Sequence, residues 1–304
     1  MKKTKLIVKT KSKIYPIIIG SNILKNTSNI LKNNNISFNK CLIIADKGVP
    51  KKNLLALKKQ ILSKTKLTHL FNSSEKNKNQ QSVNIILNKL FKNNFNRDDC
   101  IISLGGGITG DVAGYTASIY KRGLKFINIP STLLAQVDSS IGGKTGINNS
   151  YGKNLVGAFF QPDLVISDIN LLKSLSKREI ICGYGEIIKH SLIATKKTFN
   201  FLNKNKFKIL KLQSPYIEKA ISDSCKIKRN IVQLDEKEKN IRKVLNLGHT
   251  FAHAYEATLK YSGKLNHGEA VILGINSAVK FSLQNKLLNK NIHDQILSHI
   301  NHLK

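Results

Sequence analysis

Three histidines lie close together in the sequence and could bind a metal ion. His249 and His253 are four residues apart, so on a helix they share one face. His267 follows a polar segment, Lys260 to Asn266, that can turn the chain back toward that face. Imidazole is a common ligand of transition metals, so this spacing indicates a metal site. For the His249–His253 pair taken alone, solvated or structural histidines are the alternative.

Glycine-rich turns upstream indicate a nucleotide or phosphate ligand. Gly105 to Gly110 satisfies G-x-G-x-x-G between an apolar, strand-like run and a helical pattern. Glycines let the backbone approach a pyrophosphate, and a helix N-terminus offers unpaired N–H groups to an anion. Two further turns place Lys144 and Lys153 beside glycines, as phosphate sites do. One such turn is readily structural, but three in close succession favour an anionic ligand.

The composition is that of an ordinary globular protein. The chain has 304 residues, is 41% hydrophobic and has a mean hydropathy of −0.20, which allows about two domains. No apolar run approaches the ~20 residues that span a bilayer, and the N-terminus lacks a signal-peptide pattern. The four cysteines never form C-x-x-C, which fits a reducing compartment. We therefore expect a cytoplasmic protein without membrane contact.

The formal net charge of +32 is the main anomaly of the composition. A basic excess of this size attracts polyanions, and nucleic-acid binding is the alternative class of function. The lysines are, however, spread along the whole chain among Asn and Ile, with no basic arm. We expect nonspecific, salt-sensitive polyanion binding and no specific nucleic-acid partner.

Two kinds of element must position these groups. Strand-like runs at 6–8, 15–19, 41–45, 68–71 and 100–104 alternate in part with helical patterns at 54–62 and 83–91, which is typical of a parallel α/β sheet. Ligands of such sheets bind beyond the carboxyl ends of the strands, where Asp46, Glu75 and the glycines after Leu104 fall.

The periodicity then becomes helical, at 180–194, 216–234, 244–258, 270–285 and 291–304. We predict an N-terminal α/β nucleotide-binding domain with a parallel sheet over 1–165. A mostly α-helical metal-binding domain should follow over 166–304. The histidines of the last helix, His293, His299 and His302, are expected on the solvated surface.

Several long motifs resemble those of one enzyme family, and the resemblance covers essentially the whole chain. They are Leu104-Gly-Gly-Gly-Ile-Thr-Gly-Asp111, Pro130-Ser-Thr-Leu-Leu-Ala-Gln-Val-Asp138-Ser-Ser-Ile-Gly-Gly-Lys144-Thr, Gly152-Lys-Asn154, Leu247-Gly-His249-Thr-Phe-Ala-His253-Ala and Asn266-His267-Gly-Glu-Ala-Val. The family is 3-dehydroquinate synthase. Another sugar-phosphate cyclase, such as 2-deoxy-scyllo-inosose synthase, or a metal-dependent polyol dehydrogenase is the alternative. Because the chain ends at Lys304, the resemblance implies a helical domain shorter than usual for the family.

The resemblance also implies roles for individual residues. It assigns Zn²⁺ or Co²⁺ to Glu186, His249 and His267. It assigns NAD to Asp46, Glu75, Lys78, Gly106, Gly107, Gly110, Asp111, Ser131, Thr132, Lys144, Lys153, Leu171 and Ser174. It assigns substrate binding and catalysis to Asp138, Lys144, Asn154, Lys189, Lys228, Arg242, Asn246 and His253. His253 thereby becomes a substrate-facing residue rather than a metal ligand.

The reaction that the resemblance implies converts 3-deoxy-D-arabino-heptulosonate 7-phosphate to 3-dehydroquinate and phosphate. This is a carbon–oxygen lyase step of the shikimate pathway, which leads to the aromatic amino acids. NAD takes a hydride from the substrate and returns it later, so that it is regenerated in each turnover. The expected partners are a small phosphorylated sugar acid and a second copy of the chain in a homodimer.

Overall fold

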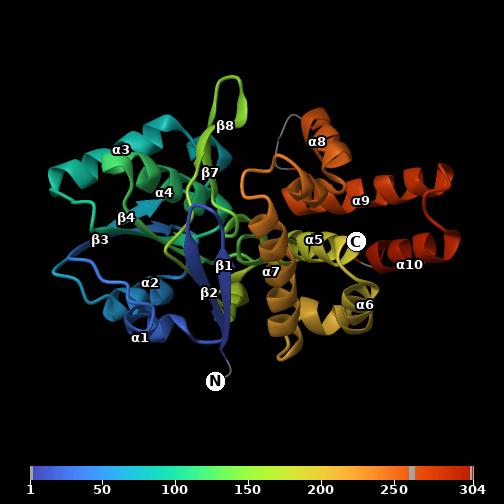
Figure 1. Ribbon diagram of the computed structural model, residues 1–304, viewed down its shortest axis with the longest axis horizontal. Coiled ribbons are helices and arrows are strands. Elements are labelled where there is room, and N and C mark those ends of the chain that lie inside the picture. Colours follow the sequence, from blue (N-terminus) through green and yellow to red (C-terminus); the bar gives the residue numbers. More distant parts are fainter. Residues whose placement is uncertain (1–2, 260–263, 302, 304) are drawn as a thin grey trace.

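The computed structural model describes residues 3–259, 264–301 and 303, and its first half is built around a seven-stranded sheet (Figure 1). The strand order is β1-β2-β9-β6-β5-β3-β4. β1 pairs antiparallel with β2, and the other neighbours are parallel. The strands are β1 Thr4–Lys9, β2 Ile14–Gly20, β3 Lys40–Asp46, β4 Thr65–Phe71, β5 Cys100–Gly105, β6 Lys125–Pro130 and β9 Leu164–Asp168. The predicted parallel α/β sheet is confirmed.

Helices cover both faces of this sheet. Alternate residues of a strand point to opposite faces, and in β3 the side chains of Ile43 and Leu42 belong to different core clusters. Ile43 packs with α1 (Thr27–Lys32) and α2 (Lys51–Gln60), whereas Leu42 packs with α3 (Gln80–Lys92) and α4 (Gly107–Ile119). Because both faces are buried, the strands read as continuous apolar runs.

A hairpin stands apart from the main sheet. β7 (Lys144–Asn149) and β8 (Gly152–Phe159) pair antiparallel and extend away from the body of the molecule (Figure 1). The base of β7 packs against α4. The turn that leads into β7 requires glycine, because Gly142 and Gly143 have φ of 101° and 69°. The second predicted glycine–lysine turn is thus a turn, whereas Lys153 of the third lies on a strand.

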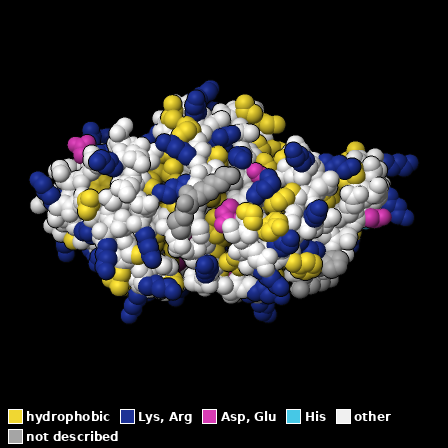
Figure 2. Space-filling model, turned by 90° about the horizontal axis from the view of Figure 1, so that it is seen from below, with side chains coloured by type: hydrophobic (Ala, Val, Ile, Leu, Met, Phe, Trp, Pro, Cys, Tyr) yellow, Lys and Arg dark blue, Asp and Glu magenta, His cyan; other side chains and the backbone are white. Residues whose placement is uncertain are grey.

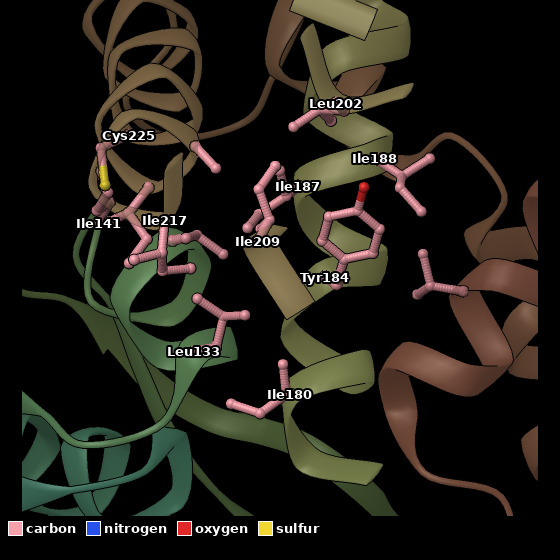
Figure 3. Packing of buried hydrophobic residues seen from close by; sticks show 14 of the residues in the cluster. Leu133, Ile141, Ile180, Tyr184, Ile187, Ile188, Leu202, Ile209, Ile217 and Cys225 are labelled. Atoms are coloured by element: carbon pink, nitrogen blue, oxygen red, sulfur yellow. The ribbon is translucent and has the colours of Figure 1, made fainter. Parts of the chain in front are cut away.

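The second half of the chain is helical, as predicted. Its helices are α5 Lys177–Ile193, α6 Lys196–Leu210, α7 Tyr216–Leu234, α8 His249–Thr258, α9 His267–Gln284 and α10 Lys290–Asn301. Figure 3 shows Tyr184, Ile187 and Ile188 of α5 within the apolar cluster that joins these helices. The same cluster includes Tyr15 and Ile17 of β2. The β1–β2 end of the sheet and the helical half therefore share one core.

Three kinds of correction apply to the sequence predictions: the bounds of predicted segments, elements that were not predicted, and one histidine. The helix predicted at 244–258 is broken, because Gly248 has a φ of 79° and α8 begins only at His249. Residues Ile241–Asn246 form a 3-10 helix instead. The helix predicted at 54–62 ends at Gln60. α6 and β6 were not predicted, and the predicted boundary at 165/166 falls inside β9.

The third correction concerns His299, which is not a surface residue. Its side chain is buried on α10, lies 3.1 Å from the Tyr184 hydroxyl and 3.0 Å from Asn203 Oδ1. A histidine on the apolar side of an amphipathic helix faces the core, and two polar partners satisfy it there. His293 is half-buried, and His302 lies outside the described residues, as do residues 260–263 of the predicted polar turn.

The surface carries its positive charge in dispersed form. On the face drawn in Figure 2, Lys and Arg side chains lie scattered among neutral ones over both halves of the molecule. All four cysteines, Cys41, Cys100, Cys182 and Cys225, are buried as free thiols. No helix in the described part of the chain has the length and apolar character needed to cross a membrane.

Candidate active site

A glutamate and two histidines converge between three helices. The Glu186 carboxylate on α5 is fully buried, and its Oε1 lies 4.0 Å from His249 Nε2 and 3.7 Å from His267 Nε2. The three ligand atoms all lie within 4.8 Å of one another. His249 is the first residue of α8 and His267 the first residue of α9. Both imidazoles therefore lie at helix N-termini that face Glu186 on α5.

Close backbone packing brings α9 up to α5. A Cβ on Gly268 would lie 2.0 Å from the carbonyl oxygen of Cys182, and one on Gly185 would lie 2.8 Å from the carbonyl oxygen of Gly268. Only glycine fits at these contacts. A capping box of Asn266 and Glu269 fixes the start of α9. Because Gly268 contacts Cys182, one turn before Glu186 on α5, the neighbouring His267 is held beside the Glu186 carboxylate.

These residues fit a divalent metal ion. Neither Glu186 oxygen has a hydrogen bond to the described residues, although Oε2 forms an ion pair with Lys189. Burial and the nearby Lys189 lower the pKa of His249 to about 3, so its imidazole is neutral, as a ligand must be. Two imidazoles and one carboxylate are a donor set that Zn²⁺ and Co²⁺ accept in catalytic sites.

A second trio, Asp138, Glu186 and His190, is equally compact but has a different character. Lys228 Nζ lies 2.5 Å from Asp138 Oδ1, and Lys189 pairs with Glu186. Burial alone would raise the pKa of Asp138, but Lys228 and Lys189 hold it well below its usual range. Lys189 and His190 face Glu186 Oε2, whereas the two proposed metal-binding histidines face Oε1. On the Oε2 side the ammonium groups already pair with both carboxylates, so this trio is an ion-pair network rather than a metal site.

The residues expected to act on substrate line one cavity of about 610 Å³. The cavity walls come from the segment before β7, the hairpin, α5, α7, the 3-10 helix and α8. All eight are present: Asp138, Lys144, Asn154, Lys189, Lys228, Arg242, Asn246 and His253. His249 lines the same cavity. The structure thus gathers them in space, while their individual roles stay predictions.

Arg242, which the resemblance assigns to the substrate, already has partners within the protein. Its guanidinium is buried and donates to the carbonyl oxygens of Glu236 and Gly142. Glu238, which the sequence reasoning missed, lies among the expected substrate groups. Its carboxylate pairs with Lys144, accepts a hydrogen bond from Asn246 Nδ2 at 3.1 Å and lies 4.0 Å from Arg242 Nε. A carboxylate therefore occupies a space suited to an anionic substrate.

The residues expected to bind NAD surround the carboxyl edge of the sheet. Asp46 ends β3, Ser131 follows β6, and Ser174 follows β9. Gly106 precedes α4, whose N-terminus has no side-chain cap, as an anion site requires. The Gly107 and Gly110 positions pack closely, since added Cβ atoms would lie 3.0 Å from Ser139 Oγ and 3.3 Å from Asn128 Nδ2.

An ion-pair network joins this edge to the hairpin. Lys78 Nζ lies 2.5 Å from Asp111 Oδ2 and 2.5 Å from Asn154 Oδ1. Glu75 Oε1 lies 3.8 Å from Lys153 Nζ. Two members of the expected NAD set make other contacts. The Leu171 side chain is buried in the core, and the Leu171 carbonyl oxygen accepts a hydrogen bond from Ser174 Oγ. Thr132 Oγ1 accepts a hydrogen bond from the Ala135 N–H.

Sequence reasoning missed His190 and Glu256 as well as Glu238. His190 is four residues after Glu186, so the helical spacing that singled out His249 and His253 could have found it. Glu256 Oε1 lies 3.7 Å from His267 Nδ1. Burial alone would lower the pKa of His267, but Glu256 and Glu186 raise it above its ordinary value. Nothing in the sequence pairs Glu256 with His267.

Comparisons with known proteins place this geometry in context. The model of the 3-dehydroquinate synthase N-terminal domain matches residues 68–182, and that of the C-terminal domain matches residues 183–304. A 3-dehydroquinate synthase from Pelagibacter ubique is 61% identical over 299 residues, covering 98% of this chain and 81% of the relative. One from Legionella pneumophila (strain Lens) is 42% identical, covering 93% of this chain and 76% of the relative.

Two solved structures have the same fold. A 2-deoxy-scyllo-inosose synthase complexed with carbaglucose-6-phosphate, NAD⁺ and Co²⁺ has a TM-score of 0.88 at 26% identity, with coverage of 98% of this chain and 81% of that one. A 2-epi-5-epi-valiolone synthase from Streptomyces hygroscopicus, with NAD⁺ and Zn²⁺ bound, has a TM-score of 0.86 at 22% identity, with coverage of 98% and 82%.

Proposed function

Because the chain belongs to the 3-dehydroquinate synthase family, we propose that the cavity and the adjoining Glu186–His249–His267 cluster are the site of that reaction. The enzyme is a carbon–oxygen lyase of the shikimate pathway. It converts 3-deoxy-D-arabino-heptulosonate 7-phosphate to 3-dehydroquinate and phosphate. One observation carries the assignment of the site: the cluster adjoins a cavity lined by the four cations Lys144, Lys189, Lys228 and Arg242.

The metal and NAD have separate places in this proposal. Glu186, His249 and His267 would hold Zn²⁺ or Co²⁺, the ions bound in the two solved relatives. When bound, the metal polarises substrate oxygens and lowers the pKa of substrate hydroxyls, while NAD accepts and returns a hydride. The N-terminus of α4 and the carboxyl edge of the sheet would hold the nucleotide.

The four cations suit a substrate that carries both a phosphate and a carboxylate. Lys189 and Lys228 are buried, so their charges are little screened. Lys144 is exposed beside Glu238, and this pair can separate to receive an anion. A cavity of about 610 Å³ lies in the usual size range for small-molecule sites. The substrate would thus be held at several anionic oxygens at once.

Asp138 and His253 have the chemistry to handle hydroxyl groups and protons. The Asp138 carboxylate stays ionised and hydrogen-bonds to Lys228, so it can accept a hydrogen bond from a substrate hydroxyl. His253 is exposed on α8, one turn after His249, and its side chain lines the cavity. From there it can move a proton between the substrate and water.

The direct test is phosphate release from the heptulosonate phosphate by the full chain with NAD⁺. We expect release that stops with a chelator and returns with Zn²⁺ or Co²⁺, without net formation of NADH. Net NADH without phosphate would instead identify a polyol dehydrogenase.

Substitution of a proposed metal ligand tests the site itself. Glu186→Gln keeps the shape of the side chain but removes the charged ligand, and we expect turnover to fall at least about a hundredfold. Lys9→Ala is the control, because its side chain is exposed on β1, outside the site, and it should keep wild-type turnover. Undiminished turnover in Glu186→Gln would refute the metal assignment.

We further propose a cytoplasmic homodimer. The family resemblance is the support for both statements. Light scattering coupled to gel filtration would give about twice the chain mass of 33.9 kDa for a dimer, and a mass of one chain would contradict the proposal.

A further inference from the structure

His190 occupies a buried position between two parts of the site. It lies on α5, one turn after Glu186, and none of its surface is exposed. Its Nδ1 is 2.6 Å from Ser224 Oγ on α7, a residue that is also buried. The imidazole is thus fixed at one end by a hydrogen bond between two helices.

The other end of the ring faces two carboxylates. His190 Nε2 lies 3.8 Å from Asp138 Oδ1 and 4.0 Å from Glu186 Oε2. It has no hydrogen bond to any residue in the described part of the chain. A buried ring nitrogen without a hydrogen bond requires an explanation, because such groups are nearly always paired. These distances are longer than hydrogen bonds, and contacts of this kind in active sites commonly tighten when substrate binds.

The surroundings determine which nitrogen carries the proton. Ionised carboxylates only accept hydrogen bonds, so Nε2 must carry the hydrogen in order to interact favourably with Asp138 or Glu186. Nδ1 is then the acceptor, and the Ser224 hydroxyl donates to it. Ser224 therefore sets the tautomer, as the partner of the second nitrogen commonly does.

Charge balance explains why a neutral donor stands here. Asp138 and Glu186 carry two negative charges, and Lys228 and Lys189 supply two positive ones. A further lysine or arginine at position 190 would unbalance this buried network, while an apolar side chain would leave both carboxylates without a donor on that side. An imidazole N–H orients them without adding charge.

We propose that His190 is a positioning residue, which holds the Asp138 and Glu186 carboxylates in the arrangement that substrate and metal require. It joins a substrate group to a metal ligand, and Ser224 fixes its orientation from α7. The inference rests on the proposed function of the site.

Two amide substitutions separate the two ends of the ring. The amide nitrogen of Asn reaches about as far as Nδ1, and that of Gln about as far as Nε2. His190→Asn therefore keeps the Ser224 contact and loses the donor to the carboxylates, whereas His190→Gln keeps that donor. We expect Asn to raise the dissociation constant for Zn²⁺ about tenfold or more and to lower kcat/KM by a similar factor. Gln should recover most of both losses.

The measurements distinguish positioning from mere stability. Zn²⁺ affinity is measured by competition with a chromophoric chelator in the absence of substrate, and thermal unfolding is recorded for each variant. Ser224→Ala should give an intermediate Zn²⁺ affinity, because the ring keeps Nε2 but loses its anchor. An Asn variant with wild-type affinity and kinetics would overturn the inference. Equal losses in Asn and Gln that follow their unfolding temperatures would overturn it as well.

Failure of the proposed function is a separate outcome. It shows in the wild-type protein, as absence of phosphate release, and it leaves the order of the Zn²⁺ affinities unchanged. That order, wild type tightest, then Gln, then Asn, supports the positioning role by itself.

Discussion

Burial changes the charge behaviour of several side chains in the cavity. It is the main cause that lowers the pKa values of Lys228 and Arg242. Partial burial has the same effect on Lys144, about half of whose side chain stays exposed, and neighbouring cations contribute at both lysines. For Lys144, the loss of solvent together with Arg242 and Lys228 outweighs the opposite effect of Asp138 and brings the pKa to about 8. The group that is proposed to bind an anion therefore titrates close to physiological pH.

This shift predicts a pH limit on substrate capture. A lysine is charged below its pKa, so Lys144 loses its charge as the pH rises through about 8, and kcat/KM should fall above that value. The substrate phosphate is already a dianion there, since its second pKa is about 6. In Lys144→Arg this fall in kcat/KM should begin more than one pH unit higher, because arginine stays charged. If kcat/KM of this variant still falls near pH 8, Lys144 is excluded as the cause of the fall.

The sequence was most informative about side chains in long motifs. The glycine–lysine turns and the His249–His267 stretch sufficed to suggest an anion site and a metal site. Glu186 and Arg242 entered only through the resemblance, because no local spacing connects them with the histidines. Glu238 and Glu256 could not be predicted, since their contacts depend on the three-dimensional approach of Lys144 and His267.

Helix starts and helix contacts decide where the metal ligands lie. Both proposed histidine ligands begin a helix, and glycine stands next to each: Gly248 before His249, and Gly268 after His267. The sequence predicted a continuous helix over 244–258 because its apolar spacing is helical. The left-handed backbone at Gly248, which interrupts it, leaves no mark on that spacing.

Gly268→Ala should disturb both stability and metal binding. The new Cβ would lie 2.0 Å from the Cys182 carbonyl oxygen, so α9 must move away from α5 and carry His267 with it. We expect a loss of about 1–3 kcal/mol in the free energy of unfolding in urea, as for other overpacked sites. Lys280→Ala on the exposed face of α9 is the control. Wild-type stability together with wild-type Zn²⁺ affinity in Gly268→Ala would show that this helix contact is not required.

The fold class could be predicted because the apolar patterns of the two halves differ. Buried runs such as 41–45 and 100–104 predicted the parallel sheet, and the change of period after Leu171 predicted the helices. The hairpin of β7 and β8 was not predicted, because half of the β8 residues are exposed and no apolar alternation marks the strand. His299 was misplaced for a related reason, since its buried partner Tyr184 lies far away in the sequence.

At the scale of the whole molecule, contacts between distant segments hold the two halves together. α7 packs on β1 and β2. Glu236, just after α7, accepts hydrogen bonds from the Ser12 N–H and hydroxyl and from Gln161 Nε2. Burial alone would raise the pKa of Glu236, but these donors lower it below its ordinary value. The ionised Glu236 carboxylate therefore stabilises the fold at neutral pH. This stabilisation is lost as the pH falls below the ordinary glutamate pKa of about 4.5 toward the lower pKa of the folded state.

Glu236→Gln tests this contact. The variant should be less stable than wild type by about 1–2 kcal/mol at pH 7, where the carboxylate is charged. The difference should shrink as the pH falls from 7 toward 3, because protonation makes the Glu236 side chain neutral like that of glutamine. Urea unfolding across this pH range measures the effect, with the exposed Asp98→Asn as the control. A difference that persists unchanged at low pH would show that the charge of Glu236 is not its cause.

The net charge of +32 predicts the behaviour of the protein toward polyanions. Because the cations are dispersed, binding to duplex DNA should be independent of sequence and should weaken by orders of magnitude between about 50 and 200 mM salt. Fluorescence anisotropy with two unrelated duplexes measures both properties. Sequence-selective binding that survives about 0.2 M salt would contradict the expectation.

The strand order also has a consequence during synthesis. β2 is made roughly 140 residues before its parallel partner β9, a delay of about 7–30 s at 5–20 residues per second. α7, which covers the same end of the sheet, emerges later still. Until then Ile17 and Ile19 lack the helical residues of their core cluster and can contact only those of β1. β1 and β2 can pair with each other at once, but they should be among the last strands to join the rest of the sheet.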